Sequence, residues 1–96
     1  MEDAIEQTPR GLALRVCLNL RNGLNARPAA RLAQEAQRYA ASIQLISDTG
    51  EVDAKSMLDI LSLAPPPNAE LTLLADGRDA REALCGLARF MSTLQD

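Results

Sequence analysis

Hydrophobic and polar residues alternate from Leu12 to Leu20, and this period of two predicts a half-buried β-strand. The aliphatic residues define a buried face, so the interleaved Arg15, Cys17 and Asn19 are expected on the solvent-exposed face. Residues 1–10, MEDAIEQTPR, have no such period and contain a proline. We therefore expect them to be a flexible N-terminal extension, followed by one domain over residues 11–96.

The pattern predicts six more elements, in the order helix, strand, strand, helix, strand, helix. Small or apolar residues recur at helical spacing in the first and last of these, and DTG at 48–50 is typical of a hairpin turn. Three consecutive prolines at 65–67 end the short helix and form a stiff connector. The predicted elements are helix 26–40, strand 42–47, strand 51–54, helix 56–63, strand 69–75 and helix 80–94.

Strands with one apolar face, combined with helices that carry a matching apolar stripe, predict an α+β fold. The expected architecture is a two-layer sandwich in which one face of the sheet stays exposed to solvent. A length of 96 residues and a hydrophobic content of 47% are typical of one globular domain with a single core.

Composition excludes several classes of function. A net charge of -3, with one Tyr and one Phe, disfavours nucleic-acid binding, which needs a basic surface and stacking aromatics. Cys17 and Cys85 form neither a CxxC pair nor a zinc site, so no metal and no cofactor is expected. No apolar run is long enough to span a membrane, and the acidic N-terminus lacks the layout of a signal peptide. These features predict a soluble cytoplasmic protein.

The start of the helix after Gly23 carries signals for anion binding. Asn25 is a favoured N-cap, Pro28 fits the first turn, and Arg27 adds a fork of donors suited to phosphate. Free N–H groups and the positive end of the helix dipole attract anions at such a place. The residues alone leave two interpretations open: a phosphate cradle, or a capped helix with a surface arginine.

The short helix after Ser56 carries two further signals. Ser56 and Asp59 have the spacing of a capping box, in which the serine hydroxyl accepts a hydrogen bond from the N–H three residues later. The helix is also apolar almost all round, so part of it is expected to contact a partner, unless the polyproline connector folds over it. Its apolar residues are Met57, Leu58, Ile60, Leu61 and Leu63.

Three stretches together resemble a known family. GLNARPA at 23–29, AKSMLDILSL at 54–63 and AELTLLADGRDAREAL at 69–84 are similar to segments of HPr, the histidine-containing phosphocarrier protein of the bacterial phosphotransferase system. The resemblance spans about residues 12–94. It implies an open-faced β-sandwich of order βαββαβα, with a four-stranded antiparallel sheet and three helices on one face, the element order predicted above.

The resemblance also implies roles for individual residues. Asn25 occupies the position of the histidine that takes phosphate from Enzyme I, with Ala26 and Arg27 as the phosphate cradle. A carboxamide nitrogen is only a donor and cannot attack phosphorus as an imidazole nitrogen can, and the sequence contains no histidine. Ser56 occupies the position of a serine phosphorylated by an ATP-dependent kinase. The partner-binding residues implied by the resemblance are Leu24, Arg27, Met57, Leu58 and Leu61, with Ile60 and Leu63 facing inward.

The leading hypothesis is a non-enzymatic, monomeric regulatory relative that binds partners through Ser56 and the adjacent apolar helix. The implied partners are an HPr-type serine kinase/phosphorylase, Enzyme I-like or transporter proteins by docking only, and a transcriptional regulator; nucleic acid and membrane are not expected. One alternative is a genuine phosphocarrier of sugar uptake whose histidine was replaced deliberately by Asn25. The other is a plain protein-interaction adaptor that uses only the apolar helix.

Overall fold

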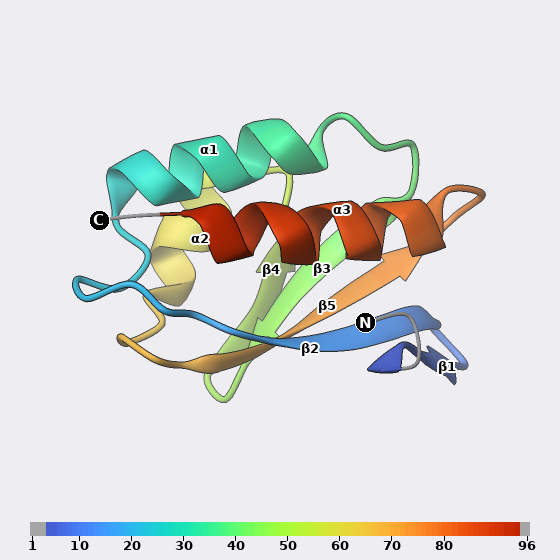
Figure 1. The fold of residues 1–96 in the computed structure, drawn as a ribbon, viewed down its shortest axis with the longest axis horizontal. Helices are drawn as coiled ribbons and strands as arrows, with labels where there is room; N and C mark the ends of the chain where they lie inside the picture. The colour runs from blue at the N-terminus through green and yellow to red at the C-terminus, as the bar shows by residue number, and fades with distance from the viewer. Residues whose placement is uncertain (1–3, 95–96) are drawn as a thin grey trace.

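The computed structural model describes residues 4–94, which form one antiparallel sheet covered by helices (Figure 1). Within this range the sheet has five strands in the order β1-β2-β5-β3-β4. Helices α1 and α3 lie side by side over the sheet, and α2 packs beside α1 and β4. The elements are β1 Glu6–Thr8, β2 Gly11–Cys17, α1 Ala26–Ala36, β3 Ser42–Ser47, β4 Gly50–Asp53, α2 Met57–Leu63, β5 Glu70–Asp76 and α3 Ala80–Thr93. The α+β fold and its element order are therefore confirmed, apart from one additional strand.

That additional strand, β1, lies in the segment predicted to be a flexible extension. Glu6, Gln7 and Thr8 pair with the first three residues of β2, so the prediction was wrong for this part of residues 1–10, while residues 1–3 lie outside the described range. A three-residue edge strand is held mainly by backbone pairing, which leaves no hydrophobic period in the sequence. The sheet therefore has five strands and not the expected four.

The strand register explains why one face of the sheet is buried. Leu14 of β2 lies opposite Leu73 of β5, which in turn lies opposite Leu45 of β3. All three are buried against α1 and α3 in the hydrophobic core. The alternate residues of β2 point to the other face, where Arg15 and Cys17 are exposed as expected.

Helix α1 ends at Ala36, four residues earlier than its apolar pattern predicted. In the loop that follows α1, the N–H groups of Ala40 and Ala41 donate to the two carboxylate oxygens of Asp79, each at 2.8 Å. These hydrogen bonds hold the pKa of Asp79 below its ordinary value, and the bond from the Ala40 N–H is the largest cause. Asp79 thus fastens the start of α3 to the loop that follows α1.

No helix between residues 4 and 94 combines the length and the apolar composition needed to cross a lipid bilayer.

Candidate functional site

The start of α1 presents an exposed helix N-terminus. Asn25 is the N-cap residue, with extended backbone angles (φ -82°, ψ -169°), and its carbonyl accepts the Ala29 N–H at 2.9 Å. Its side chain makes no capping hydrogen bond, so the side-chain cap expected from the sequence is not formed. The carboxamide of Asn25 is exposed to solvent.

Two exposed residues follow Asn25 in the first turn. Ala26 and Arg27 are both on the surface, whereas Pro28 is buried beneath them. Arg27 takes part in none of the ion pairs formed within residues 4–94. Arg27 is thus an exposed cation in the first turn of α1, where a helix N-terminus favours anions. The assignment of Ala26 and Arg27 as a phosphate cradle stays a prediction.

Leu24, expected to contact a partner, instead belongs to the core. Its side chain is only 4% exposed, so it is not available at the surface and its assignment to a partner surface is wrong. Leu24 follows a tight turn at Gly23, which has a positive φ of 70°. A Cβ at Gly23 would lie 2.9 Å from the carbonyl oxygen of Pro65, so this turn packs closely against the polyproline connector.

Ser56 caps α2 as the sequence predicted. Its hydroxyl oxygen accepts the N–H of Asp59 at 3.2 Å, and its own backbone N–H donates to the Asp53 carbonyl at 3.1 Å. Ser56 is half-buried, so the hydroxyl is held at the helix start and remains partly accessible. The capping role of Ser56 is confirmed.

The residue before Ser56 links α2 to the end of α1, a feature that sequence reasoning missed. Lys55 Nζ donates to the Tyr39 carbonyl at 2.7 Å, and Gln37 Nε2 donates to the Lys55 carbonyl at 2.8 Å. No periodic pattern in the sequence marks these two hydrogen bonds, because the bonded residues are separated by 16 and by 18 positions in the chain. They fix the position of the Ser56 segment relative to α1.

Only part of the apolar surface of α2 is exposed. Leu58 is 75% exposed and Met57 is 36% exposed, so both point outward as expected. Ile60 is fully buried, and Leu61 is half-buried against the core. The polyproline connector does not cover Leu58, so that alternative is wrong for the most exposed residue of the helix. Leu61 offers a partner less surface than expected.

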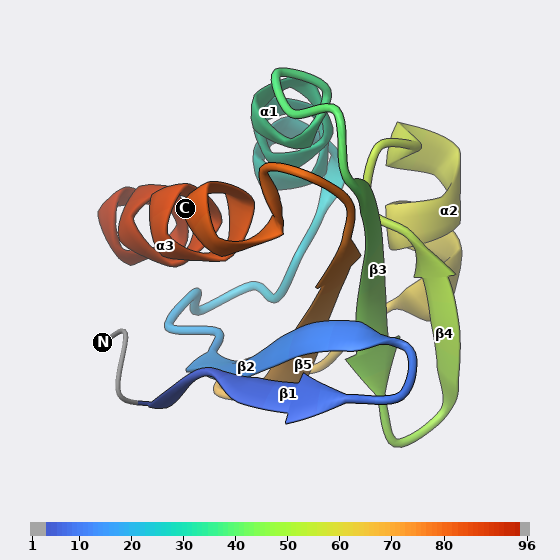
Figure 2. The ribbon, with the colours of Figure 1, turned by 90° about the vertical axis from the view of Figure 1, so that its right-hand side faces the viewer.

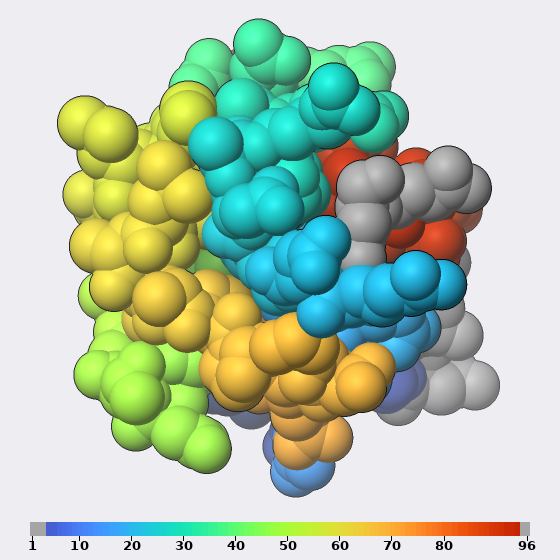
Figure 3. All heavy atoms as spheres, turned by 90° about the vertical axis from the view of Figure 1, so that its left-hand side faces the viewer, coloured from blue at the N-terminus to red at the C-terminus, as the bar shows by residue number. Residues whose placement is uncertain are grey.

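The two helix starts belong to one face of the molecule (Figure 3). The segment that leads into α1, the α2 helix and the polyproline connector lie side by side on this face. A protein that docks here can therefore contact the exposed N-terminus of α1 and the apolar surface of α2 at the same time.

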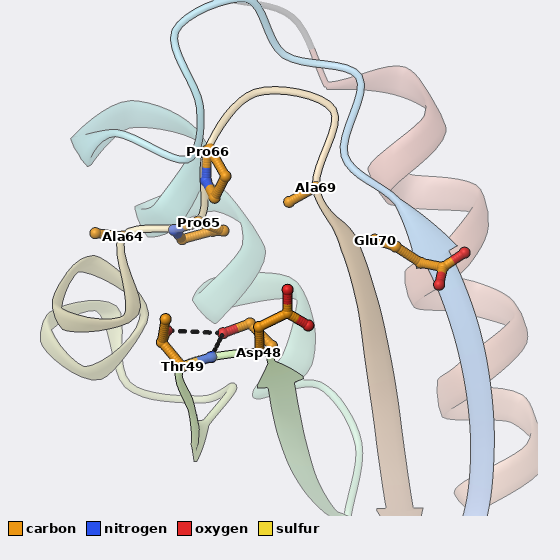
Figure 4. A pocket seen from close by; sticks show the side chains of 8 residues that line it. Asp48, Thr49, Ala64, Pro65, Pro66, Ala69 and Glu70 are labelled. Atoms are coloured by element: carbon orange, nitrogen blue, oxygen red, sulfur yellow. Dashed lines mark hydrogen bonds between the residues drawn. The ribbon is translucent and has the colours of Figure 1, made fainter.

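A neighbouring cavity of about 380 Å³ lies between the β3–β4 turn and the connector (Figure 4). Its rim carries the carboxylates of Asp48 and Glu70, and the Ser47 and Thr49 side chains hydrogen-bond each other at 3.1 Å. Two carboxylates with no basic residue among the lining residues disfavour phosphate. Nor does any cluster of three potential metal ligands occur within residues 4–94.

Comparison with known proteins identifies the family. The family model for the PTS HPr component phosphorylation site matches residues 13–93, a range that includes both helix starts. The chain belongs to the HPr family. The match begins inside β2, so β1 and the turn that follows it lie outside the part shared with the family model.

The similar proteins include one named for catabolite repression, Crh, and others named as phosphocarrier proteins. The HPr-like protein Crh of Bacillus subtilis is 43% identical over 77 residues, which cover 80% of this chain and 91% of Crh. The crystal structure of the phosphocarrier protein HPr from Bacillus anthracis superposes with a TM-score of 0.76 at 45% identity, covering 81% of this chain and 93% of that one. A crystal structure of Bacillus subtilis Crh, described as a domain-swapped dimer, gives a TM-score of 0.68 at 43% identity, covering 75% of this chain and 83% of that one. Membership in the family therefore does not by itself distinguish a carrier from a regulator.

Proposed function

We propose that this HPr-family protein is a regulatory binding module that does not carry phosphate at the start of α1. The observation that carries this proposal is the exposed carboxamide of Asn25 at the helix start, in a chain without histidine. The nitrogen lone pair of a carboxamide is delocalised into the carbonyl, so Asn25 can donate a hydrogen bond but cannot attack phosphorus.

Regulation is assigned to Ser56 and the adjacent surface of α2. The Ser56 hydroxyl is partly accessible at a helix N-terminus, where an added phosphate gains from the free N–H groups and the helix dipole. An HPr-type serine kinase/phosphorylase acting in the cytoplasm would modify this hydroxyl. Met57 and Leu58 would supply the apolar contact for that enzyme, for an Enzyme I-like or transporter protein that only docks, and for a transcriptional regulator.

A second candidate function rests on the residues around Asn25. GLNARPA at 23–29 matches the carrier stretch that it resembles in Arg27 and Pro28, and only the histidine at position 25 is lacking. A phosphocarrier whose histidine had been replaced by asparagine would have this sequence. The regulatory module differs from such a phosphocarrier because its regulation is placed at Ser56. A plain adaptor differs from both because it needs neither a phosphate acceptor at position 25 nor Ser56.

Phosphate transfer from phosphoenolpyruvate tests the first proposal. Incubated with Enzyme I and phosphoenolpyruvate, the protein is expected to acquire no acid-labile phosphate. The Asn25→His variant is expected to acquire about one phosphate per chain, because it supplies an imidazole next to Arg27. Arg27→Ala in the Asn25→His background is the matched control, and we expect it to slow the transfer. Stoichiometric transfer to the protein with Asn25 in place would refute the proposal.

A further inference from the structure

Strands β4 and β2 differ in how well they resist pairing with a strand from another molecule: β4 forms one edge of the sheet, and β2 lies next to the other edge, which is formed by the short β1. β4 is a four-residue strand, GEVD, with two charged residues. β2 is a seven-residue strand, GLALRVC, with Arg15 as its single charge. Short and charged edge strands resist pairing with a strand from another molecule, and long apolar ones invite it. β2 therefore needs a cover that β4 does not need.

The cover is β1, and it extends over only part of β2. Thr8, Gln7 and Glu6 pair with Gly11, Leu12 and Ala13, in that order. Residues 14–17 of β2 pair with β5 on one side and, within the described range, with no strand on the other side. Half of the β2 edge is thus occupied by the chain itself.

The turn between β1 and β2 is held by several interactions. Thr8 Oγ1 donates to the Gly11 carbonyl at 2.8 Å and accepts the Arg10 N–H at 3.1 Å. Both Arg10 guanidinium nitrogens donate to the carboxylate of Glu51 in β4, the opposite edge strand, with Nη1 to Oε1 at 3.0 Å. The turn therefore reaches across the outer face of the sheet (Figure 2).

The sheet beneath this turn is also adapted to it. Leu74 lies opposite Ala13 and points to the outer face of the sheet, away from the main core cluster. Its side chain is nevertheless only 7% exposed. Gly11 has a φ of 134°, and a Cβ there would lie 2.5 Å from the Ala75 carbonyl oxygen. The first residue of β2 can approach β5 this closely only because residue 11 is glycine.

A groove of about 370 Å³ lies beside the uncovered half of the β2 edge. It runs between β2 and the C-terminal half of α3, and its lining residues include Leu14, Val16, Ala88 and Met91. A strand added next to residues 14–17 would place alternate side chains over this mostly apolar groove. The edge thus offers both backbone hydrogen-bonding groups and a surface for side chains.

We propose that the β2 edge is a self-association surface for the β2 edge of a second copy of this chain, and that β1 with its pinned turn is the guard that occupies it. Antiparallel pairing of one strand with its own copy is self-complementary, as a two-fold dimer requires. The guard lies outside the range matched by the family model, and the related Crh was crystallised as a domain-swapped dimer. The intact chain is accordingly a monomer because the guard competes with the second copy for the β2 edge.

Removing the guard tests this proposal. A chain that lacks residues 1–9 and a control that lacks only residues 1–3 are compared with the full chain by size-exclusion chromatography with light scattering, over a series of concentrations in reducing buffer. The full chain and the control should elute near the monomer mass, 10.3 kDa for the full chain. The chain without residues 1–9 should approach twice its own monomer mass as concentration rises. A monomer at every concentration, or a full chain that dimerises equally, overturns the proposal.

Two further variants keep the test decisive. Ala13→Lys in the chain without residues 1–9 places a charge on the exposed edge and should restore the monomer. Thr8→Ala combined with Arg10→Ala in the full chain releases the turn without shortening the protein, and it should shift part of the population to dimer at high concentration. If the shortened chain fails to fold, as judged by circular dichroism, this full-length variant decides: a strict monomer counts against the guard.

Discussion

The starts of α1 and α2 are two helix N-termini on one face of the protein, and they differ in what their capping residues can do. Asn25 at the start of α1 is exposed, and its side chain makes no capping bond. Ser56 at the start of α2 is half-buried, and its hydroxyl caps the helix through the N–H of Asp59. The carboxamide of Asn25 makes no capping bond and is not a nucleophile, whereas Ser56 has a hydroxyl that can accept a phosphoryl group.

This difference shows how a chain can keep an anion-binding geometry without the chemistry that would use it. Arg27 remains exposed at the start of α1, yet the chain has no histidine to serve as a nucleophile beside it. At α2, the hydroxyl stands beside the exposed apolar side chains of Met57 and Leu58. Under the proposed function, docking and modification are thus concentrated at α2, and α1 contributes only binding.

The largest expected effect separates modification at the two helix starts. With ATP and an HPr-type serine kinase, Ser56→Ala should acquire no phosphate, because the acceptor hydroxyl is gone. Asn25→Ala should be phosphorylated like the unchanged protein. Peptide mass spectrometry locates the phosphate, and Ser62→Ala is the matched control within α2. Phosphate at Ser47, Thr49 or Ser62 in the unchanged protein would refute the assignment to Ser56.

A second prediction compares the buried and exposed faces of α2. Ile60→Ala removes a fully buried side chain and should lower the free energy of unfolding by about 2 to 5 kcal/mol. Leu58→Ala should change it by less than about 0.5 kcal/mol, because Leu58 is 75% exposed. Urea denaturation measures both. Leu58→Glu should weaken kinase binding by about 1 to 3 kcal/mol if this face is the docking surface. Unchanged binding would mean that the face is merely exposed.

A third prediction compares the two capping residues directly. Ser56→Ala removes a capping hydrogen bond and should cost about 0.5 to 2 kcal/mol of stability. Asn25→Ala removes no such bond and should cost less than the serine change. Thermal and urea unfolding of the two variants measure the difference. Equal losses would show that Asn25 makes a capping interaction in solution, and the contrast between the two helix starts would then disappear.

The smallest expected effect concerns pH and the third helix. The pKa of Asp79 is lowered by hydrogen bonds from the Ala40 and Ala41 N–H groups, so its carboxylate stabilises the fold above the unfolded pKa of about 4. That contribution is lost as the pH falls through the lower folded pKa. Asp79→Asn should therefore be less stable than the unchanged protein at pH 7, and the difference should shrink in acid. Asp76→Asn is the control, and an unfolding difference independent of pH would contradict the assignment.

Local patterns in the sequence determined much of the fold and part of the candidate site. The alternation from Leu12 to Leu20 and the apolar stripe of the last helix each recur within a few residues, so they predict a strand and a helix without knowledge of any distant partner. The cap at Ser56 is equally local, since donor and acceptor are three residues apart. The absence of histidine is likewise fixed by composition, and it carries the proposed function.

Other features were decided only by the tertiary structure, because they depend on residues far apart in the chain. The loop after α1 is held by Asp79, about forty residues later, whose carboxylate accepts hydrogen bonds from the N–H groups of Ala40 and Ala41. Leu24 is buried because the turn at Gly23 packs against Pro65, and β1 exists because β2 has a free edge beside it. In each case the local sequence permits several conformations, and the one adopted is selected by hydrogen bonds and packing that form only when the distant segments meet.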